Sequence, residues 1–129
     1  MANGRMRLSK QGVERLDKVI AELNLNGKRP EALRIAFAKG ISETKGEPLE
    51  RNTTGGWEIP ERIIAVGEEY ILYKHLIIER IAAPIYDHKM IDKYMLGYIE
   101  AGLEKMELEI NELSDLDNYM LKLVQQAKS

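Results

Sequence analysis

Apolar residues recur at spacings of three and four through most of this sequence, which is the period of an amphipathic α-helix. The first such pattern predicts a helix over residues 10–24, capped by Ser9, with core-facing positions at Val13, Leu16, Val19, Ile20 and Leu23. Pro30 fits the first turn of a second helix, which aligns Leu33, Ala36, Phe37 and Ile41. These patterns predict a mainly helical protein.

The middle of the chain predicts a longer helix. It begins at Pro60, is rich in isoleucine and is ended by Pro84. Isoleucine also favours strands, but roughly 20 residues without a turn signal exceed the length of an ordinary strand. We therefore expect a long helix over about residues 60–81, and we expect it to form the centre of the fold.

Two more helices are predicted in the last third of the chain. Asp87 can cap the first of them, whose apolar line consists of Ile91, Met95, Tyr98, Gly102 and Met106. The glycine in this line predicts that a neighbouring helix approaches closely. Residues 114–117 resemble a capping box, which predicts a separate last helix with apolar positions at Leu116, Met120, Leu123 and Val124.

The remaining segments are predicted to be extended or irregular. Residues 5–9 alternate polar and apolar side chains as a short strand does, and residues 57–59 predict a second extended segment. Residues 42–57 are rich in Gly, Ser, Thr, Asn and Pro and predict a mobile surface loop. A chain of 129 residues suits one domain, in which residues 58–129 supply the helical core and the oligomerisation region.

Charge is divided unevenly along the chain. Residues 1–45 hold ten Lys and Arg against five Asp and Glu, a net of +5, whereas residues 46–129 hold nine against sixteen, a net of −7. The predicted strand places Arg5, Arg7 and Ser9 on one face and Met6 and Leu8 on the other. A basic patch confined to one segment is typical of a surface that binds nucleic-acid phosphates.

Six residues are predicted to contact DNA phosphates. Lys28 and Arg29 precede a helix, where backbone N–H groups also favour an anion. Arg15 and Lys18 are weaker candidates, because they can pair with Glu22 or Glu14 at helical spacing. The predicted contacts are Arg5, Arg7, Lys10, Lys28, Arg29 and Arg34.

Several kinds of chemistry have no support in the sequence. There is no cysteine, so disulfides, thiolate metal sites and persulfides are excluded. His75 and His88 are the only histidines and lack carboxylates at metal-ligand spacing, and no nucleotide-loop or hydrolase motif occurs. We predict no catalytic residue, metal or cofactor. No apolar run is long enough to span a bilayer and no signal segment is evident, so we expect a cytoplasmic protein without membrane contact.

A short basic strand followed by two helices is the layout of a ribbon-helix-helix protomer, which places paired strands on DNA. Such a strand needs a partner, either from a second chain or from elsewhere in the same chain. This pattern favours an N-terminal ribbon-helix-helix-like unit followed by a bundle of long helices, assembled as an oligomer. A transcriptional repressor or antitoxin is one function that this layout allows.

Segments of this layout also resemble the DndE family of DNA sulfur-modification proteins. The likeness runs over roughly residues 5–106 and is carried by residues 5–10, 33–37, 67–68 and 98–103. It implies a mainly helical protein that assembles as a tetramer and binds duplex DNA, preferring nicks. Partner proteins would supply the sulfur and the ATP-driven steps of phosphorothioation. The absence of cysteine agrees with an accessory role.

The sequence departs from the family pattern in two places. The first helix contains fewer lysines, and residues 25–28 replace a short Thr-Gly turn. Residues after about 107 lie outside the resemblance and are expected to add an oligomerisation helix. A further alternative is an assembly subunit whose basic segment docks onto an acidic partner protein instead of DNA.

Overall fold

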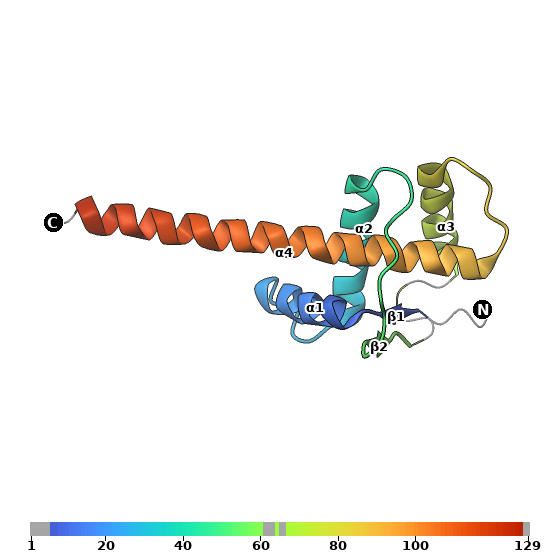
Figure 1. Ribbon diagram of the computed structural model, residues 1–129, viewed down its shortest axis with the longest axis horizontal. Coiled ribbons are helices and arrows are strands. Elements are labelled where there is room, and N and C mark those ends of the chain that lie inside the picture. The colour runs from blue at the N-terminus through green and yellow to red at the C-terminus, as the bar shows by residue number, and fades with distance from the viewer. Residues whose placement is uncertain (1–5, 61–63, 65–66, 128–129) are drawn as a thin grey trace.

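Four helices and a two-stranded sheet make up the computed structural model, which describes residues 6–60, 64 and 67–127 and confirms a mainly helical protein (Figure 1). In chain order the elements are β1 (Arg7–Leu8), α1 (Lys10–Glu22), α2 (Arg29–Glu43), β2 (Trp57–Glu58), α3 (Glu68–Ile81) and α4 (His88–Ala127).

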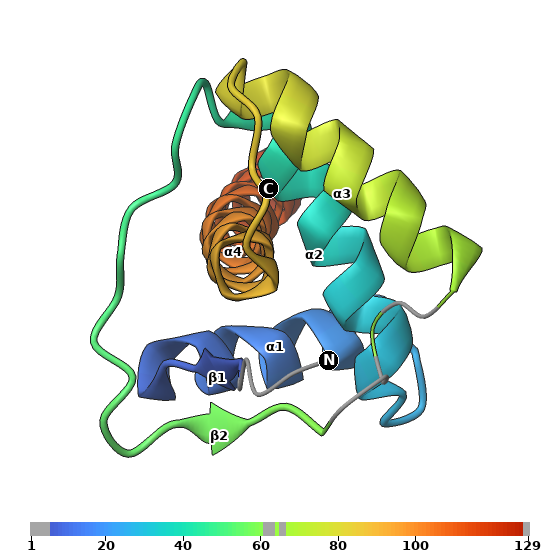
Figure 2. The same cartoon turned by 90° about the vertical axis from the view of Figure 1, so that its right-hand side faces the viewer.

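The first half of α4 is the centre of the fold. Figure 2 views this helix end-on, with α1, α2, α3 and the loop before β2 arranged around it. Its predicted apolar line is confirmed, because Ile91, Met95, Tyr98, Gly102 and Met106 are all buried. The carbonyl oxygen and the carboxylate of Asp87 accept hydrogen bonds from backbone N–H groups in the first turn of α4, which confirms its predicted role as a cap.

Two glycines allow α2 and α4 to cross with their backbones in contact. A Cβ atom on Gly102 would lie 1.8 Å from the carbonyl oxygen of Ala36, and one on Gly40 would lie 1.7 Å from that of Tyr98. Both distances are far below van der Waals contact, so only glycine fits at either position. The close approach predicted at Gly102 is confirmed, and α2 is the helix that approaches.

β1 and β2 form an antiparallel pair, with Arg7 opposite Glu58 and Leu8 opposite Trp57. A further hydrogen bond of 2.8 Å from Ile59 N to the carbonyl oxygen of Met6 extends the pairing. The partner strand that a short N-terminal strand requires therefore comes from the same chain. Leu8 is fully buried, which anchors the sheet on the helical core.

The predicted long helix from Pro60 is wrong in its first part. Ile64 is a buried residue in a bend, and α3 begins only at Glu68, after Gly67 with a φ of 58°. Residues 61–63 and 65–66 lie outside the described residues. The expectation that this helix is central is also wrong, because α3 lies at the periphery and Ile77 is its only buried residue.

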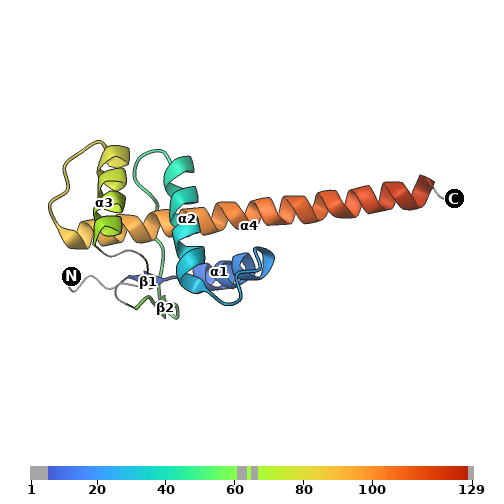
Figure 3. The same ribbon diagram turned by 180° about the vertical axis from the view of Figure 1, so that it is seen from behind.

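The predicted break at residues 114–117 is wrong as well. These residues lie inside α4, which continues for 40 residues, about 60 Å at 1.5 Å per residue. A capping side chain acts only where the chain enters a helix from an extended conformation, and no proline or glycine interrupts the helix here. From Asn111 onward every described residue is exposed, and this end of the helix projects away from the other elements (Figures 1 and 3).

The loop between α2 and β2 runs along α4. Tyr98 donates a hydrogen bond of 2.6 Å to the carbonyl oxygen of Gly46, and Tyr94 donates one of 3.1 Å to Glu47. Further along, Lys93 pairs with Glu50. The residues predicted to be a loop therefore have defined contacts with the central helix.

Candidate nucleic-acid interface

The start of α1 is fixed by a buried carboxylate. Glu100, on α4, is 1% exposed and accepts hydrogen bonds from the backbone N–H of Ser9 at 2.8 Å and from its hydroxyl at 3.0 Å. The same hydroxyl accepts the N–H of Gly12 at 2.9 Å, which confirms Ser9 as the N-cap of α1. A negative charge at a helix N-terminus is stabilised by the helix dipole. The hydrogen bonds to Glu100 therefore fix the main chain directly before Lys10, the first residue of α1.

Arg7 and Arg29 both contact β2. The Arg7 guanidinium lies 3.6 Å from the Glu58 carboxylate, and both side chains are nearly half exposed. Arg29 lies 4.5 Å above the ring of Trp57 and pairs with Asp17 at 3.1 Å. Stacking on an aromatic ring holds the guanidinium plane in place, and the Arg29 side chain stays one-third exposed.

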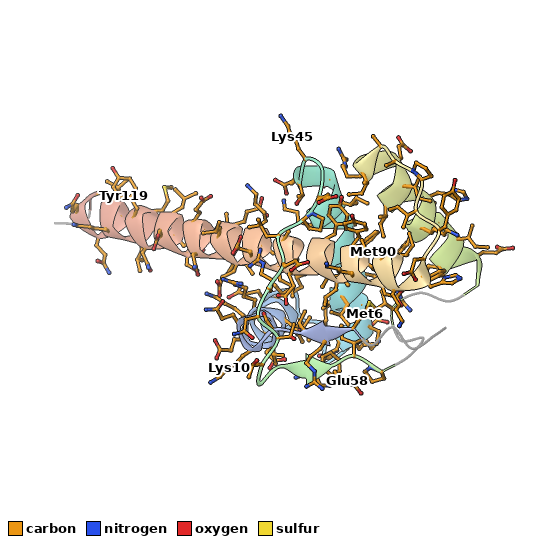
Figure 4. All side chains as sticks on the ribbon, turned by 45° about the vertical axis from the view of Figure 1, so that its right-hand side comes forward. Met6, Lys10, Lys45, Glu58, Met90 and Tyr119 are labelled. Atoms are coloured by element: carbon orange, nitrogen blue, oxygen red, sulfur yellow. The ribbon has the colours of Figure 1, made fainter. Side chains whose placement is uncertain are left out.

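Lys10 and Lys28 are exposed and form no ion pair with another described residue. Lys28 occupies the N-cap position of α2 and makes no capping hydrogen bond through its side chain. Together with Arg7 and Arg29, these two lysines form a surface around β2 that we call the basic edge. Figure 4 shows Lys10 and Glu58 on the same side of the body.

Two predicted phosphate contacts are not part of this surface. Arg34 is half-buried between α2 and the start of α3, where it donates a hydrogen bond of 2.7 Å to the carbonyl oxygen of Ile64 and pairs with Glu69 at 3.3 Å. The Arg34 guanidinium therefore connects α2 to the segment before α3 and to the first turn of α3. Arg5 lies outside the described residues.

Most other cations of α1 and α2 face acidic residues of α4. Arg15 pairs with Glu107 at 3.2 Å and with Glu104 at 3.7 Å, and Lys18 donates a hydrogen bond of 2.6 Å to Asn111. The predicted pairing of Arg15 and Lys18 within α1 is therefore wrong. Glu104, Glu107 and Asn111 are spaced three and four apart on α4, a signal in the sequence that marks one polar face of the helix.

Lys39 and Arg51 extend this arrangement. Lys39 pairs with Glu109 at 2.7 Å and with Glu43 at 2.6 Å, and these hydrogen bonds raise its pKa. Arg51, in the loop, lies 3.1 Å from Glu104 and lowers the pKa of that carboxyl. Part of the positive charge of α1 and α2 is thus neutralised by ion pairs with acidic residues of α4.

A second polar cluster lies where α3 meets the start of α4. Asp92 is 4% exposed, and burial raises its pKa, while Tyr70 donates a hydrogen bond of 3.2 Å to its Oδ1 atom. Burial also raises the pKa of Tyr70 to about 12. The Oδ2 atom of Asp92 has no hydrogen-bond partner among the described residues. His88 Nδ1 lies 3.4 Å from the Tyr70 hydroxyl.

The described residues provide no group of three or more His, Cys, Asp or Glu side chains that could hold a metal ion. A hollow of about 480 Å³ lies between the loop and α4, lined by Glu50, Arg51, Lys93 and Glu100 among others. Glu50 pairs with Lys93, Arg51 pairs with Glu104, and Glu100 accepts the hydrogen bonds from Ser9. The Nε atom of Arg51 is buried and has no hydrogen-bond partner among the described residues.

No known family model, curated protein or solved structure matches this chain. Within the described part of the chain, no helix is both long and apolar enough to cross a membrane.

Proposed function

We propose that this protein is a non-catalytic DNA-binding subunit of a DNA phosphorothioation complex, and that it binds duplex DNA with a preference for nicks. The observation that supports DNA binding is the basic edge, where Lys10 and Lys28 are exposed and unpaired among the described residues. The sequence resemblance to the DndE family supports the phosphorothioation context.

The basic edge has dimensions that suit a DNA backbone. Lys10 begins α1 and Lys28 follows its end, and a 13-residue helix is about 20 Å long. Phosphates along one strand are spaced by about 3.4 Å of helix axis, so this length covers about six base-pair steps. Arg7 and Arg29 lie at the same edge and can exchange their exposed carboxylate partners for phosphates.

Binding at this edge is electrostatic and does not read base sequence. Lysine side chains contact phosphate as point charges, which positions a protein on DNA without specifying bases. A preference for nicks then arises from deformability, because a break in one strand lowers the free energy of bending and unstacking at that step. Sulfur transfer and ATP hydrolysis belong to partner proteins in this proposal.

A salt titration of DNA binding tests the proposal. Fluorescence anisotropy gives the Kd for labelled intact and nicked duplexes of one sequence, with wild type and the Lys10→Ala, Lys28→Ala double variant. If each lysine neutralises one phosphate, the slope of log K against log salt falls by about 0.9 for each. Both side chains are exposed, so the thermal unfolding temperature is expected to stay unchanged.

Lys89→Ala with Lys122→Ala is the matched control, since both lysines are exposed on α4, away from the basic edge. We expect this control to bind as wild type does. Failure of wild type to bind either duplex in dilute buffer refutes the proposal, as does a double variant that binds normally. Tight binding to one intact sequence, with no response to a nick, favours the ribbon-helix-helix repressor instead.

The assembly-subunit alternative predicts a different outcome. The double variant would then lose an acidic protein partner in a co-purification experiment, and wild type would show no affinity for DNA. The intramolecular pairing of β1 with β2 weakens the repressor alternative, because one edge of the strand is already occupied.

A further inference from the structure

The last part of α4, residues 111–127, projects from the body, which it contacts at Asn111 through the hydrogen bond from Lys18. All of its residues are exposed, and it extends about 25 Å past the body. Figure 4 shows Tyr119 on this segment, far from the side chains of the other elements. We call residues 111–127 the tail. An isolated helix of this length is only marginally stable in water, so its stability depends on packing.

The tail carries an apolar stripe. Leu113, Leu116, Met120 and Leu123 are spaced three, four and three residues apart and are between 42% and 59% exposed. At 100° per residue, the stripe continues the face of α4 that packs against the core through Met95 and Met106. Side chains at this spacing form the seam of paired helices.

We propose that the tails of two copies of this chain pair as an antiparallel, two-fold symmetric coiled coil. The spacing of three, four and three reads the same in both directions. A two-fold axis at Asn118 therefore places Leu113 opposite Leu123 of the second copy and Leu116 opposite Met120 of the second copy. Every member of the stripe then packs against another member, as a self-complementary interface requires.

The charges beside the stripe favour this direction. In a parallel pair, Glu112 of each copy lies beside Asp117 of the other, which gives two repulsive contacts. In the antiparallel pair the two Asp117 side chains approach each other, which gives a single repulsive contact. Antiparallel pairing also sets the two bodies at opposite ends of the shared helix pair, where they do not collide.

The available area makes the dimer weak. Each stripe side chain can bury about 100 Å², so four on each copy bury about 800 Å². Tyr119 and Val124 flank the stripe and bring the total near the lower limit of about 1,000 Å² for a specific interface. The pairing is independent of DNA binding, and it doubles the number of basic edges in one particle.

Analytical ultracentrifugation over a range of concentrations tests the proposal. Wild type is expected to approach twice the monomer mass of 14.8 kDa as concentration rises. The Leu116→Glu, Met120→Glu double variant is expected to stay monomeric with unchanged helix content in the body, because both side chains are more than half exposed and lie beyond the body. Leu121→Glu is the matched control, since Leu121 is 57% exposed but lies about 100° around the helix from Met120.

Engineered disulfides test the direction, because the chain has no cysteine of its own. Asp117→Cys is expected to cross-link two copies under oxidising conditions, whereas Leu113→Cys is expected not to, since its own counterpart lies about 15 Å away along the pair. Cross-linking of Leu113→Cys alone overturns the antiparallel arrangement.

Three further results overturn the pairing itself. A wild type that stays monomeric at every concentration assigns the stripe to a different partner. Equal disruption by Leu121→Glu shows that the stripe is not the contact. An oligomer that the Leu116→Glu, Met120→Glu double variant leaves intact assembles through another surface.

Discussion

Replacing Gly102 with alanine tests the crossing of α2 and α4 on which the whole fold depends. The added Cβ would lie 1.8 Å from the carbonyl oxygen of Ala36 and 2.9 Å from the backbone nitrogen of Gly40. Ordinary contact begins at 3.4 Å, so the helices must separate by 3.4 − 1.8 = 1.6 Å along this direction. Both nearest atoms belong to backbone, so no side-chain rotation relieves the clash.

The separation is costly because it affects the packing of two helices. A gap of 0.5–1 Å already forfeits about a quarter to a half of the dispersion energy across an interface. Overpacking a core lowers the free energy of unfolding by about 1–3 kcal/mol, and we expect a clash between two backbones to cost about 3 kcal/mol. Alanine favours helix by about 1 kcal/mol over glycine, which leaves a net loss of about 2 kcal/mol. At about 3–5 °C per kcal/mol, the unfolding temperature should fall by about 6–10 °C.

Thermal and urea unfolding followed by circular dichroism measure this loss. Gly97→Ala is the control in the same helix, because its Cβ meets the ring of Pro48 at 2.4 Å in a loop and not the backbone of another helix. We expect a change within about 1 kcal/mol for the control, since the gain in helix propensity offsets much of the clash. An unfolding temperature of Gly102→Ala equal to or above that of wild type would refute the reasoning.

Two further substitutions test buried carboxylates. Glu100→Gln should reduce the free energy of unfolding by about 2 kcal/mol, because an amide cannot accept both hydrogen bonds from Ser9. Urea unfolding measures this loss, with the exposed Glu112→Gln as the control. An equal loss of stability in the two variants would contradict the prediction. Burial raises the pKa of Asp92 above its ordinary value of 3.8, so its stabilising contribution is present below pH 3.8 and is lost as pH rises through the raised pKa. Asp92→Asn should therefore gain stability over wild type between acidic and neutral pH, and a difference that does not change with pH would count against this.

The helices were predictable where the signals are local. Ser9, Pro30 and Asp87 each begin or precede a helix through contacts within a few residues, and the sequence contains those residues. The apolar line from Ile91 to Met106 depends only on helical periodicity, so its burial was also predictable.

The errors arose where local signals conflict. The apolar run after Pro60 fits a helix, but the glycine at position 67, with its positive φ, marks the later start. At residues 114–117 the capping residues compete with an apolar periodicity that continues to Leu123. The periodicity prevails because a helix already formed gains a hydrogen bond with each added residue.

The pairing of the basic residues could not be read from the sequence. Arg15 and Glu107 are 92 residues apart, and their contact exists only because α1 packs beside α4. The role of Glu100 was missed for the same reason, although a carboxylate between Ile99 and Ala101 in an apolar stretch is unusual enough to attract attention. Of the predicted site, Lys10 and Lys28 are exposed without an ion pair among the described residues, whereas Arg34 is bound to Ile64 and Glu69.

The central position of α4 has a consequence for synthesis on the ribosome. The helix that completes the core emerges after α1, α2 and α3, and the hydrogen bonds between Ser9 and Glu100 join residues 91 positions apart. Until residues 88–106 have left the exit tunnel, α1 and α2 lack the helix against which they pack most extensively. Productive folding is therefore expected to wait for α4 and to be slowed by these long-range contacts. Nascent chains that stall before α4 should expose hydrophobic surface and be targets for chaperones.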